Sequence, residues 1–409
     1  MNADAHAAAQ VAARSQDAAF GTVDRLHMTR ALRLAEQGAY TTKPNPMVGC
    51  VIAQGERVLG EGWHARAGEA HAEIHALAAA GDAARGATAY VTLEPCAHHG
   101  RTGPCVEALI AAGVGRVVAA MRDPFPQVDG AGFARLQAAG IAVEHGLLEA
   151  QARQLNQGFL SRVERGRPWL RVKLAMSLDG RTALANGDSK WISGEAARRD
   201  VMRWRARAGA ILTGAGTVLA DDPSLTVRFD SDEGDAGAPA FVPPLRVVLD
   251  PGLATVARGK VRQGDAPTLY LHAPDAKPPR GFDAPRAAVP LRAGVAGAGG
   301  PAVGGPGMGG QGAGGLDLEA VLRHLATAHH INEVQVESGA TLAGALLRAG
   351  LVDEVLLYVA PVLLGADARP LFDGLGIDDM ARRLHLRTVE TRRIGDDLRL
   401  LLRPQAPAA

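Results

Sequence analysis

Two cysteines and two histidines stand close together in the segment PCAHHGRTGPC, residues 95–105. The thiols of Cys96 and Cys105 could form a disulfide, act as a nucleophile or bind a metal. The chain has three cysteines, an odd number, and its start lacks the basic and apolar segments of a secretory signal. A disulfide framework is therefore not expected, and metal binding or catalysis remains.

A second polar pair lies upstream in GEAHAEIHAL, where His71 and Glu73 open a segment with helical character. Residues two apart on a helix point to nearly opposite sides, so both can serve one site only if that site lies beyond the helix N-terminus. The HExxH pattern of metalloproteases needs the glutamate directly after the first histidine, and here Ala72 intervenes. The spacing therefore argues against a protease.

Zinc in catalytic sites commonly takes three protein ligands and leaves a fourth position for water. His71, Cys96 and Cys105 supply that number, and Pro104 suits the start of another helix. A helix N-terminus beside a metal favours the thiolate form of cysteine. We therefore predict a metal site at these three residues, whereas Cys50, inside the apolar run VGCVIA, is predicted to lie in the core.

The elements that position these residues follow a repeating order. From Val23 onward, helix-like and strand-like segments alternate, which predicts an α/β domain with a mostly parallel sheet. The polar segment RGRP precedes a second α/β pattern that begins at Trp169. We predict a loose extension (1–20), a first domain (21–166), and a second domain (167–409) with a floppy Gly-rich insertion at about 293–315.

Composition excludes several classes of function. The chain has 409 residues, 47% of them hydrophobic, and a formal net charge of +1. It lacks the basic blocks of a nucleic-acid binder, and no apolar run approaches the ~18 residues that span a bilayer. We expect a cytoplasmic enzyme for a small polar substrate, with no nucleic-acid or membrane partner, that forms a homo-oligomer.

The first domain resembles the zinc-dependent cytidine-deaminase-like superfamily, whose signature is HxE followed by a PC-containing loop. The eight residues before the second cysteine, together with TKPNPMVGCV (42–51) and GWHARAGEAHAE (62–73), are similar to the riboflavin-biosynthesis deaminase branch. This resemblance covers roughly residues 23–164 and implies an α/β/α sandwich.

The same resemblance implies hydrolytic deamination with zinc, which makes hydroxide available near neutral pH. It assigns the Zn²⁺ ligands to His71, Cys96 and Cys105, the proton transfers to Glu73, contacts with the substrate ring to Asn45 and His64, and the sugar phosphate to Arg101. The last three could equally be turn or surface residues.

The second domain resembles the reductase of the riboflavin pathway, which has a dihydrofolate-reductase-like fold. The resemblance is carried by KLAMSLDGRTA (173–183), SKWIS (189–193), ILTGAGTVLADDPSLTVR (211–228) and VESGATLAGALL (336–347). A Rossmann fingerprint fails, because Leu219 replaces the last glycine of GxGxxG. The glycine-containing turn in GATLAG opens a helix whose free amide groups can hold a diphosphate, which suits a nicotinamide dinucleotide. The resemblance implies that this cofactor is NADPH.

The resemblance also implies which side chains line this second site. Cofactor contacts are assigned to Ala175, Trp191, Thr217, Asp221, Gly339, Ala340, Thr341, Leu342, Ala343, Gly344 and Ala345. Substrate contacts are assigned to Lys173, Ser189, Arg205, Leu225, Arg228 and Glu337, with the two arginines suited to a phosphate. Lys173 and Asp179 are candidates for proton movement, although Lys173 could instead only contact cofactor or substrate.

Together, the resemblances predict a bifunctional riboflavin-biosynthesis enzyme. It would deaminate 2,5-diamino-6-(5-phosphoribosylamino)pyrimidin-4-one to 5-amino-6-(5-phosphoribosylamino)uracil and then reduce the ribosyl group to ribityl with NADPH. Two alternatives remain open at this point. One is a zinc deaminase of RNA, which requires a basic surface. The other is a structural zinc clip closed by a fourth ligand from His75, His98 or His99.

Overall fold

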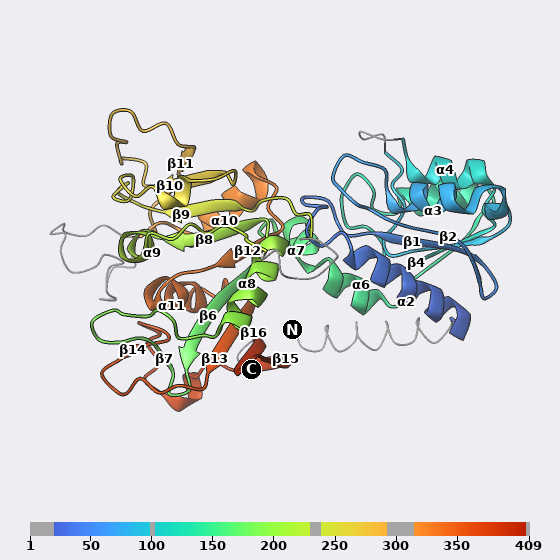
Figure 1. Cartoon of the computed structure of the whole chain (residues 1–409). Coiled ribbons are helices and arrows are strands. Elements are labelled where there is room, and N and C mark those ends of the chain that lie inside the picture. The colour runs from blue at the N-terminus through green and yellow to red at the C-terminus, as the bar shows by residue number, and fades with distance from the viewer. Residues whose placement is uncertain (1–19, 99–102, 230–238, 293–314, 406–409) are drawn as a thin grey trace. The chain divides into compact units, whose positions relative to one another are not determined.

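A computed structural model describes residues 20–98, 103–229, 239–292 and 315–405 (Figure 1). The chain divides into two compact units, Met1–Arg165 and Gly166–Ala409, and each is built around one large β-sheet with helices on both faces. The predicted N-terminal extension and the Gly-rich insertion fall, apart from their last residues, outside the described ranges. Within these ranges no helix is both long and apolar enough to cross a membrane.

In the sheet of the first unit, four of the five strands run in one direction, which agrees with the prediction of a mostly parallel sheet, but two of its four pairings are antiparallel. Strand β1 runs antiparallel to both of its neighbours, and β3, β4 and β5 are parallel. A turn at Gly55, with φ of 58°, joins β1 to β2, which the periodicity did not reveal. The strand order is β2 (Arg57–Trp63), β1 (Gly49–Gln54), β3 (Thr88–Val91), β4 (Arg116–Ala119) and β5 (Ala142–His145).

Helices cover both faces of this sheet. Alternate residues of β1 divide between the two faces: Cys50 and Ile52 belong to one apolar cluster, and Val51 and Ala53 belong to another. Cys50 is therefore a core residue, as predicted. The first face packs against α3 (Ala72–Ala80), α4 (Cys105–Ala112) and α5 (Ala131–Ala138), with the short turn η1 (Gly81–Ala84), and the second against α2 (Thr22–Glu36), α6 (Glu149–Leu155) and α7 (Gln157–Arg165).

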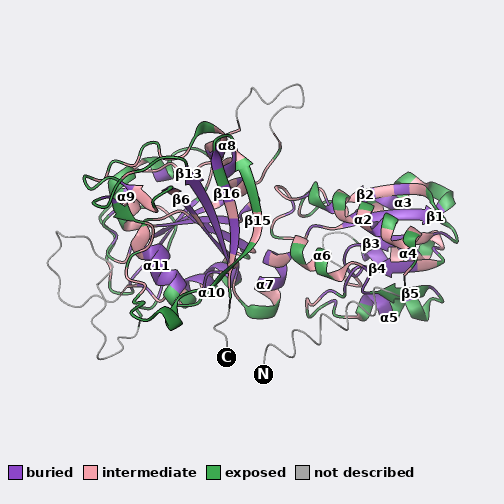
Figure 2. Ribbon diagram, turned by 90° about the horizontal axis from the view of Figure 1, so that it is seen from below, coloured by how far each residue is buried: buried purple, intermediate pink, exposed green. Residues whose placement is uncertain are grey.

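The second unit has a sheet of nine strands whose centre is parallel and whose edge is an antiparallel hairpin. Figure 2 shows the central strands as buried and β15 as exposed. The order is β11 (Arg286–Ala288), β10 (Thr268–His272), β9 (Leu245–Leu249), β8 (Ala210–Gly214), β12 (Glu333–Val336), β6 (Trp169–Ser177), β13 (Glu354–Ala360), β16 (Asp397–Pro404) and β15 (Leu386–Ile394). Strands β7 (Arg181–Ala183) and β14 (Arg369–Pro370) pair separately.

Two helices pack on each face of this larger sheet. Helices α10 (Leu318–Ala328) and α11 (Ala340–Arg348) contact one face, and α8 (Glu195–Arg207) and α9 (Ala215–Asp221) contact the other. Helix α8 is not evident from the periodicity of the sequence, because charged residues interrupt its apolar pattern and it buries only Ala197, Asp200, Val201 and Ala206. Short 3₁₀ turns occupy Lys260–Arg262 and Met380–Arg382.

Helix α3 lies against the backbone of β2 at Gly62. A Cβ atom at this position would stand 2.4 Å from the Ala72 carbonyl oxygen and 2.5 Å from the His75 Cβ. Only glycine permits this approach, and it fixes where the N-terminus of α3 meets the sheet.

We predict that Gly62→Ala lowers the free energy of unfolding of the first unit by about 2–3 kcal/mol, because the backbone must shift to admit the methyl group. Thermal unfolding and metal content of the purified chain check this. Gly252→Ala is the matched control, since an added Cβ there meets nothing within 4 Å. Equal stability of the two variants would contradict the proposed contact.

Candidate active site

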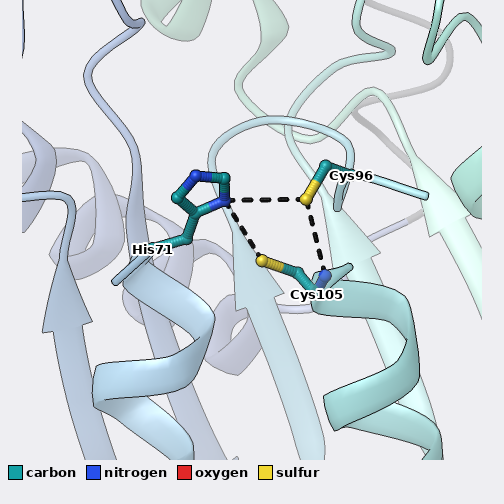
Figure 3. Close-up of side chains that lie close together, drawn as sticks. All are labelled: His71, Cys96 and Cys105. Atoms are coloured by element: carbon teal, nitrogen blue, oxygen red, sulfur yellow. Dashed lines mark hydrogen bonds between the residues drawn. The ribbon is translucent and has the colours of Figure 1, made fainter. Parts of the chain in front are cut away.

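Two helix N-termini and one loop bring three potential metal ligands, one imidazole and two thiols, together (Figure 3). His71 is the N-cap of α3, Cys105 is the first residue of α4, and Cys96 lies in the loop after β3. The His71 Nδ1 atom is 3.3 Å from the Cys105 sulfur and 3.6 Å from the Cys96 sulfur. All three ligand atoms lie within 4.8 Å of one another, and this donor set fits a zinc ion.

No fourth histidine, cysteine or acidic side chain joins this group within the described ranges. His75 is exposed on α3, His98 stands outside the group, and His99 lies beyond the described residues. The described side chains therefore form the three-ligand set of a catalytic zinc site and not the four-ligand set of a structural one.

The pKa values of the two thiols are shifted in opposite directions. The Cys105 thiol donates a hydrogen bond to Cys96 and, despite the burial of Cys96, lowers the pKa of that thiol to about 4; His71 acts in the same direction. The same hydrogen bond, together with burial, raises the pKa of Cys105. The backbone N–H of Cys105 also donates to the Cys96 sulfur at 3.4 Å. Of the two thiols, Cys96 therefore loses its proton the more readily, and the thiolate is the form of cysteine that binds metals.

Glu73 is a buried carboxylate beside these ligands. It lies in the first turn of α3, is 3% exposed and reaches the Cys105 thiol. Its Oε2 atom has no hydrogen-bond partner, and burial, followed by the negative charge of Cys96, raises the pKa of Glu73 to about 7. A buried carboxylate oxygen without a hydrogen-bond partner destabilises the fold. Such a group, with a shifted pKa, is typical of a functional site.

The structure also places Asn45 and His64 next to the three ligands. The His64 ring makes an edge contact with His71, with 5.1 Å between ring centroids. Its Nδ1 lies 3.2 Å from the Ala70 carbonyl oxygen, so Nδ1 carries the proton and Nε2 accepts from the Asn45 amide at 3.1 Å. Burial lowers the pKa of His64. Arg101, the predicted phosphate contact, lies outside the described residues.

Two buried acids, Glu94 and Asp123, lie next to the Cys96 loop and were not predicted from the sequence. Glu94 accepts the N–H of Asp123 at 3.2 Å and three further N–H groups from residues 130–133 at 2.9 to 3.3 Å. It thereby ties the Cys96 loop to the loop that follows β4. Burial raises the pKa of Asp123 to about 6, and the charges of Glu94 and Cys96 add to this effect. The only sequence signal was an acid placed two residues before a predicted ligand.

In the second unit, Lys173, Arg205 and Glu337 form one charged group. The Arg205 guanidinium donates two hydrogen bonds of 2.7 Å to Glu337, and its third donor bonds the Thr226 carbonyl at 2.8 Å. Burial acts to raise the pKa of Glu337, but Arg205 outweighs it and lowers the pKa to about 2. Burial lowers the pKa of Lys173, and the nearby Glu337 charge opposes this shift.

Arg205 therefore directs two of its in-plane N–H donors at a protein carboxylate. Its predicted contact with a substrate phosphate stays a prediction, while Arg228, the other predicted phosphate contact, is exposed. Leu225 is buried with a positive φ of 49°, and Ser189 is half-buried.

Seven of the predicted cofactor residues, 339–345, lie at the start of α11, and the other four lie on β6, on α9 and before α8. The Thr217 hydroxyl of α9 accepts the N–H of Gly339, the N-cap of α11, at 3.3 Å, so the two helices begin side by side. Ala340 and Thr341 are half-buried in the first turn of α11, Ala175 is half-buried on β6, and Asp221 and Trp191 are exposed, with the Arg198 guanidinium over the indole ring. Leu342, Ala343, Gly344 and Ala345 are buried.

Gly344 has a packing role of its own. A Cβ at this position would stand 2.1 Å from the Asp373 carbonyl oxygen.

Asp179, the other candidate for proton movement, accepts the N–H groups of Leu364 and Gly365 at 3.2 and 2.8 Å. Its hydrogen bonds, first of all the one from Ser177, lower the pKa of Asp179 to about 2. Asp179 is thus an ionised loop clamp at neutral pH.

Comparison with known proteins defines the class of each unit. Residues 22–121 match the family described as the cytidine and deoxycytidylate deaminase zinc-binding region, and residues 168–400 match the RibD C-terminal domain. The riboflavin biosynthesis protein RibD of Escherichia coli is 47% identical over 385 residues, which span 93% of this chain and 99% of that protein. The Aquifex aeolicus protein of the same name is 34% identical over 92% of this chain and 97% of its own.

Solved structures agree with this assignment. Acinetobacter baumannii RibD superposes with a TM-score of 0.81 at 41% identity and covers 94% of this chain and 99% of its own. A Thermotoga maritima structure described as a diaminohydroxyphosphoribosylaminopyrimidine deaminase/5-amino-6-(5-phosphoribosylamino)uracil reductase has a TM-score of 0.77 at 30% identity, over 94% of this chain and 99% of its own.

A metal-dependent deaminase unit followed by a nicotinamide-dependent reductase unit is the class that these folds define. The chain belongs to the RibD family of riboflavin biosynthesis proteins. It is a bifunctional enzyme, a hydrolase and an oxidoreductase, and its predicted fold class is confirmed. The alternatives of an RNA deaminase and a non-catalytic zinc clip are not supported.

We predict that Glu94→Gln lowers the free energy of unfolding by about 1–3 kcal/mol, because the new amide N–H₂ faces backbone donors. Metal affinity should fall with it, since the Cys96 loop loses its tie. Denaturant unfolding and zinc content check this. Glu69→Gln, at an exposed and weak ion pair with Arg66, is the control and should leave both quantities unchanged. Unchanged zinc affinity in Glu94→Gln would contradict the role assigned to Glu94.

Proposed function

We propose that this chain deaminates 2,5-diamino-6-(5-phosphoribosylamino)pyrimidin-4-one and then reduces the ribosyl group of the deaminated product. The observation that carries the first step is the meeting of the His71 Nδ1 and two sulfurs beside the buried Glu73. The description of the Thermotoga relative names the corresponding deaminase and reductase activities, and we assign the same substrates to this chain.

In the deaminase site, we assign Zn²⁺ to His71, Cys96 and Cys105. Bound there, zinc supplies Lewis acidity that makes hydroxide available near neutral pH. Glu73 takes up a proton from the attacking water at its unpartnered Oε2. It then delivers this proton to the pyrimidine ring and to the departing amine. Asn45 and His64, which already hold each other by a hydrogen bond, orient the pyrimidine ring. We assign the sugar phosphate to Arg101.

In the reductase site, we assign the diphosphate of NADPH to the first turn of α11, where Gly339 and Thr217 meet. We also keep the remaining predicted cofactor contacts as part of this proposal: Ala175, Trp191, Asp221, Ala340, Thr341, Leu342, Ala343, Gly344 and Ala345. NADPH supplies the hydride that reduces the ribose C1 carbon. Ser189, Arg205, Leu225, Arg228 and Glu337 are the proposed substrate contacts.

The bond from C1 to the ribose ring oxygen breaks as C1 is reduced, and that oxygen needs a proton. Asp179 is ionised at neutral pH and occupied by backbone N–H groups, so it is a poor donor. The Lys173 ammonium can donate a proton and faces Glu337, and burial lowers the pKa of Lys173. We therefore assign the proton to Lys173 and its orientation to Glu337.

Glu73→Gln should lower the deamination rate by about 10²–10⁴-fold, because the amide cannot accept a proton. Zinc content should stay within error of the parent chain, and NADPH oxidation with the deaminated substrate should be unchanged. Ammonia release, metal analysis and absorbance at the NADPH band measure these three quantities. A variant that retains deamination would overturn the assignment of Glu73.

Incubation of the purified chain with the diaminopyrimidine nucleotide tests the order of the steps. We expect ammonia release without NADPH, followed by NADPH oxidation once the cofactor is added. Chelation of the metal should abolish the first signal and leave the reduction of supplied 5-amino-6-(5-phosphoribosylamino)uracil intact. NADPH oxidation before any ammonia release would contradict the proposed order.

A further inference from the structure

Lys173 stands in a row of polar side chains that crosses the larger sheet beneath α8. In the register of β6 and β13, Ala175 pairs with Tyr358, and in that of β13 and β16, Tyr358 pairs with Arg399. Paired residues point to the same face of a sheet, and Lys173 shares the face of Ala175 because the two are two residues apart. Lys173, Tyr358 and Arg399 therefore lie on one face.

The tyrosine in this row is held rigidly. Its hydroxyl donates to the Asp200 carboxylate of α8 at 2.6 Å, and Arg399 donates to both oxygens of the same carboxylate at 3.0 and 2.8 Å. Arg399 also donates to Glu390 of β15 at 2.9 Å. Tyr358, Asp200 and Arg399 are all buried. These bonds leave the phenol ring a single orientation.

The ring in turn faces the Lys173 ammonium. The Nζ atom lies 5.8 Å from the centroid of the Tyr358 ring, within the range of about 6 Å for a cation–π contact. No hydrogen bond or ion pair holds Lys173 among the described residues. The charged groups that face it are Glu337 after β12, whose oxygens Arg205 already binds, and Arg205 itself on α8, which repels it.

We propose that Tyr358 is a positioning residue of the reductase site: its ring, fixed by Asp200 and Arg399, holds the Lys173 ammonium beside Glu337. This inference rests on the proposed role of Lys173. The Asp200–Arg399 pair acts only through the tyrosine, so it influences reduction from a distance and has no contact with the reacting atoms.

Three single variants and one double variant, Tyr358→Phe with Asp200→Asn, test the chain of contacts. Tyr358→Leu removes the ring and should lower the reductase kcat at least tenfold. It should also move the alkaline limb of the reductase pH profile down by about 0.5 pH unit, since loss of a cation–π contact disfavours the charged lysine. Tyr358→Phe keeps the ring and should lose only about threefold. Asp200→Asn should match Tyr358→Phe, and the double variant should lose no more than either single one.

Tyr270→Leu is the matched control, because this tyrosine is equally buried in the same sheet, on β10, and belongs to another apolar cluster. It should keep the reductase kcat and the pH limb of the parent chain. The deaminase rate serves as a reference within each preparation. If Tyr358→Leu behaves like the control in rate and pH profile, the positioning role is overturned.

Lys173→Met separates the two levels of the proposal. A variant that still reduces the substrate at the parent rate overturns the assignment of Lys173, and the role of Tyr358 with it. Loss of reduction in Lys173→Met with a normal rate and pH profile in Tyr358→Leu overturns the role of Tyr358 alone. If Tyr358→Leu fails to fold, additive losses in Tyr358→Phe and Asp200→Asn overturn it instead.

Discussion

The carboxyl end of a parallel strand meets the N-terminus of the following helix at one edge of a sheet, and both sites of this chain depend on that meeting. In the first unit, β3 ends before Cys96, and α3 and α4 begin with His71 at the N-cap and Cys105 at the first position. In the second unit, β12 ends before Glu337, and α11 begins just beyond it. Free N–H groups and positive helix ends therefore gather beside the two thiols of the first unit and beside Glu337 in the second.

The second unit buries several charged side chains on its central strands. Arg171, 1% exposed, bonds Glu354 at 2.7 Å and Glu333 at 3.2 Å, and it stacks on the Trp204 ring. Buried ion pairs of this kind cost desolvation free energy and stabilise little in net terms. Their effect here is to link β6, β12 and β13, the three strands that carry or precede Lys173, Glu337 and Tyr358. These pairs therefore cross the strands on which the proposed reductase site is built.

Local patterns predicted most of the elements but not their partners. Apolar runs such as VGCVIA and TLYLHA mark strands because a buried strand needs apolar residues on both faces. Helix α8 was missed because its arginines and acids make contacts with distant strands, and such contacts leave no local periodicity. The hairpin of β1 and β2 was missed for a related reason: β2 is half-buried and carries glycines where α3 approaches.

The sequence by itself determined the types of chemistry: one imidazole, two thiols and a carboxylate at a spacing that only a few families use, and a second set of motifs with a glycine-opened helix. It also indicated the α/β class of both units, because strand and helix periodicity are local properties of the chain, whereas the particular folds were implied by the resemblance of the motifs to known families. Outside the predicted metal site, only the tertiary structure decided which side chains meet. Arg205 reaches Glu337 across 132 residues, and Glu94 gathers N–H groups from up to 39 residues away. Such distances are set by how strands order themselves in a sheet, and no local pattern encodes that order.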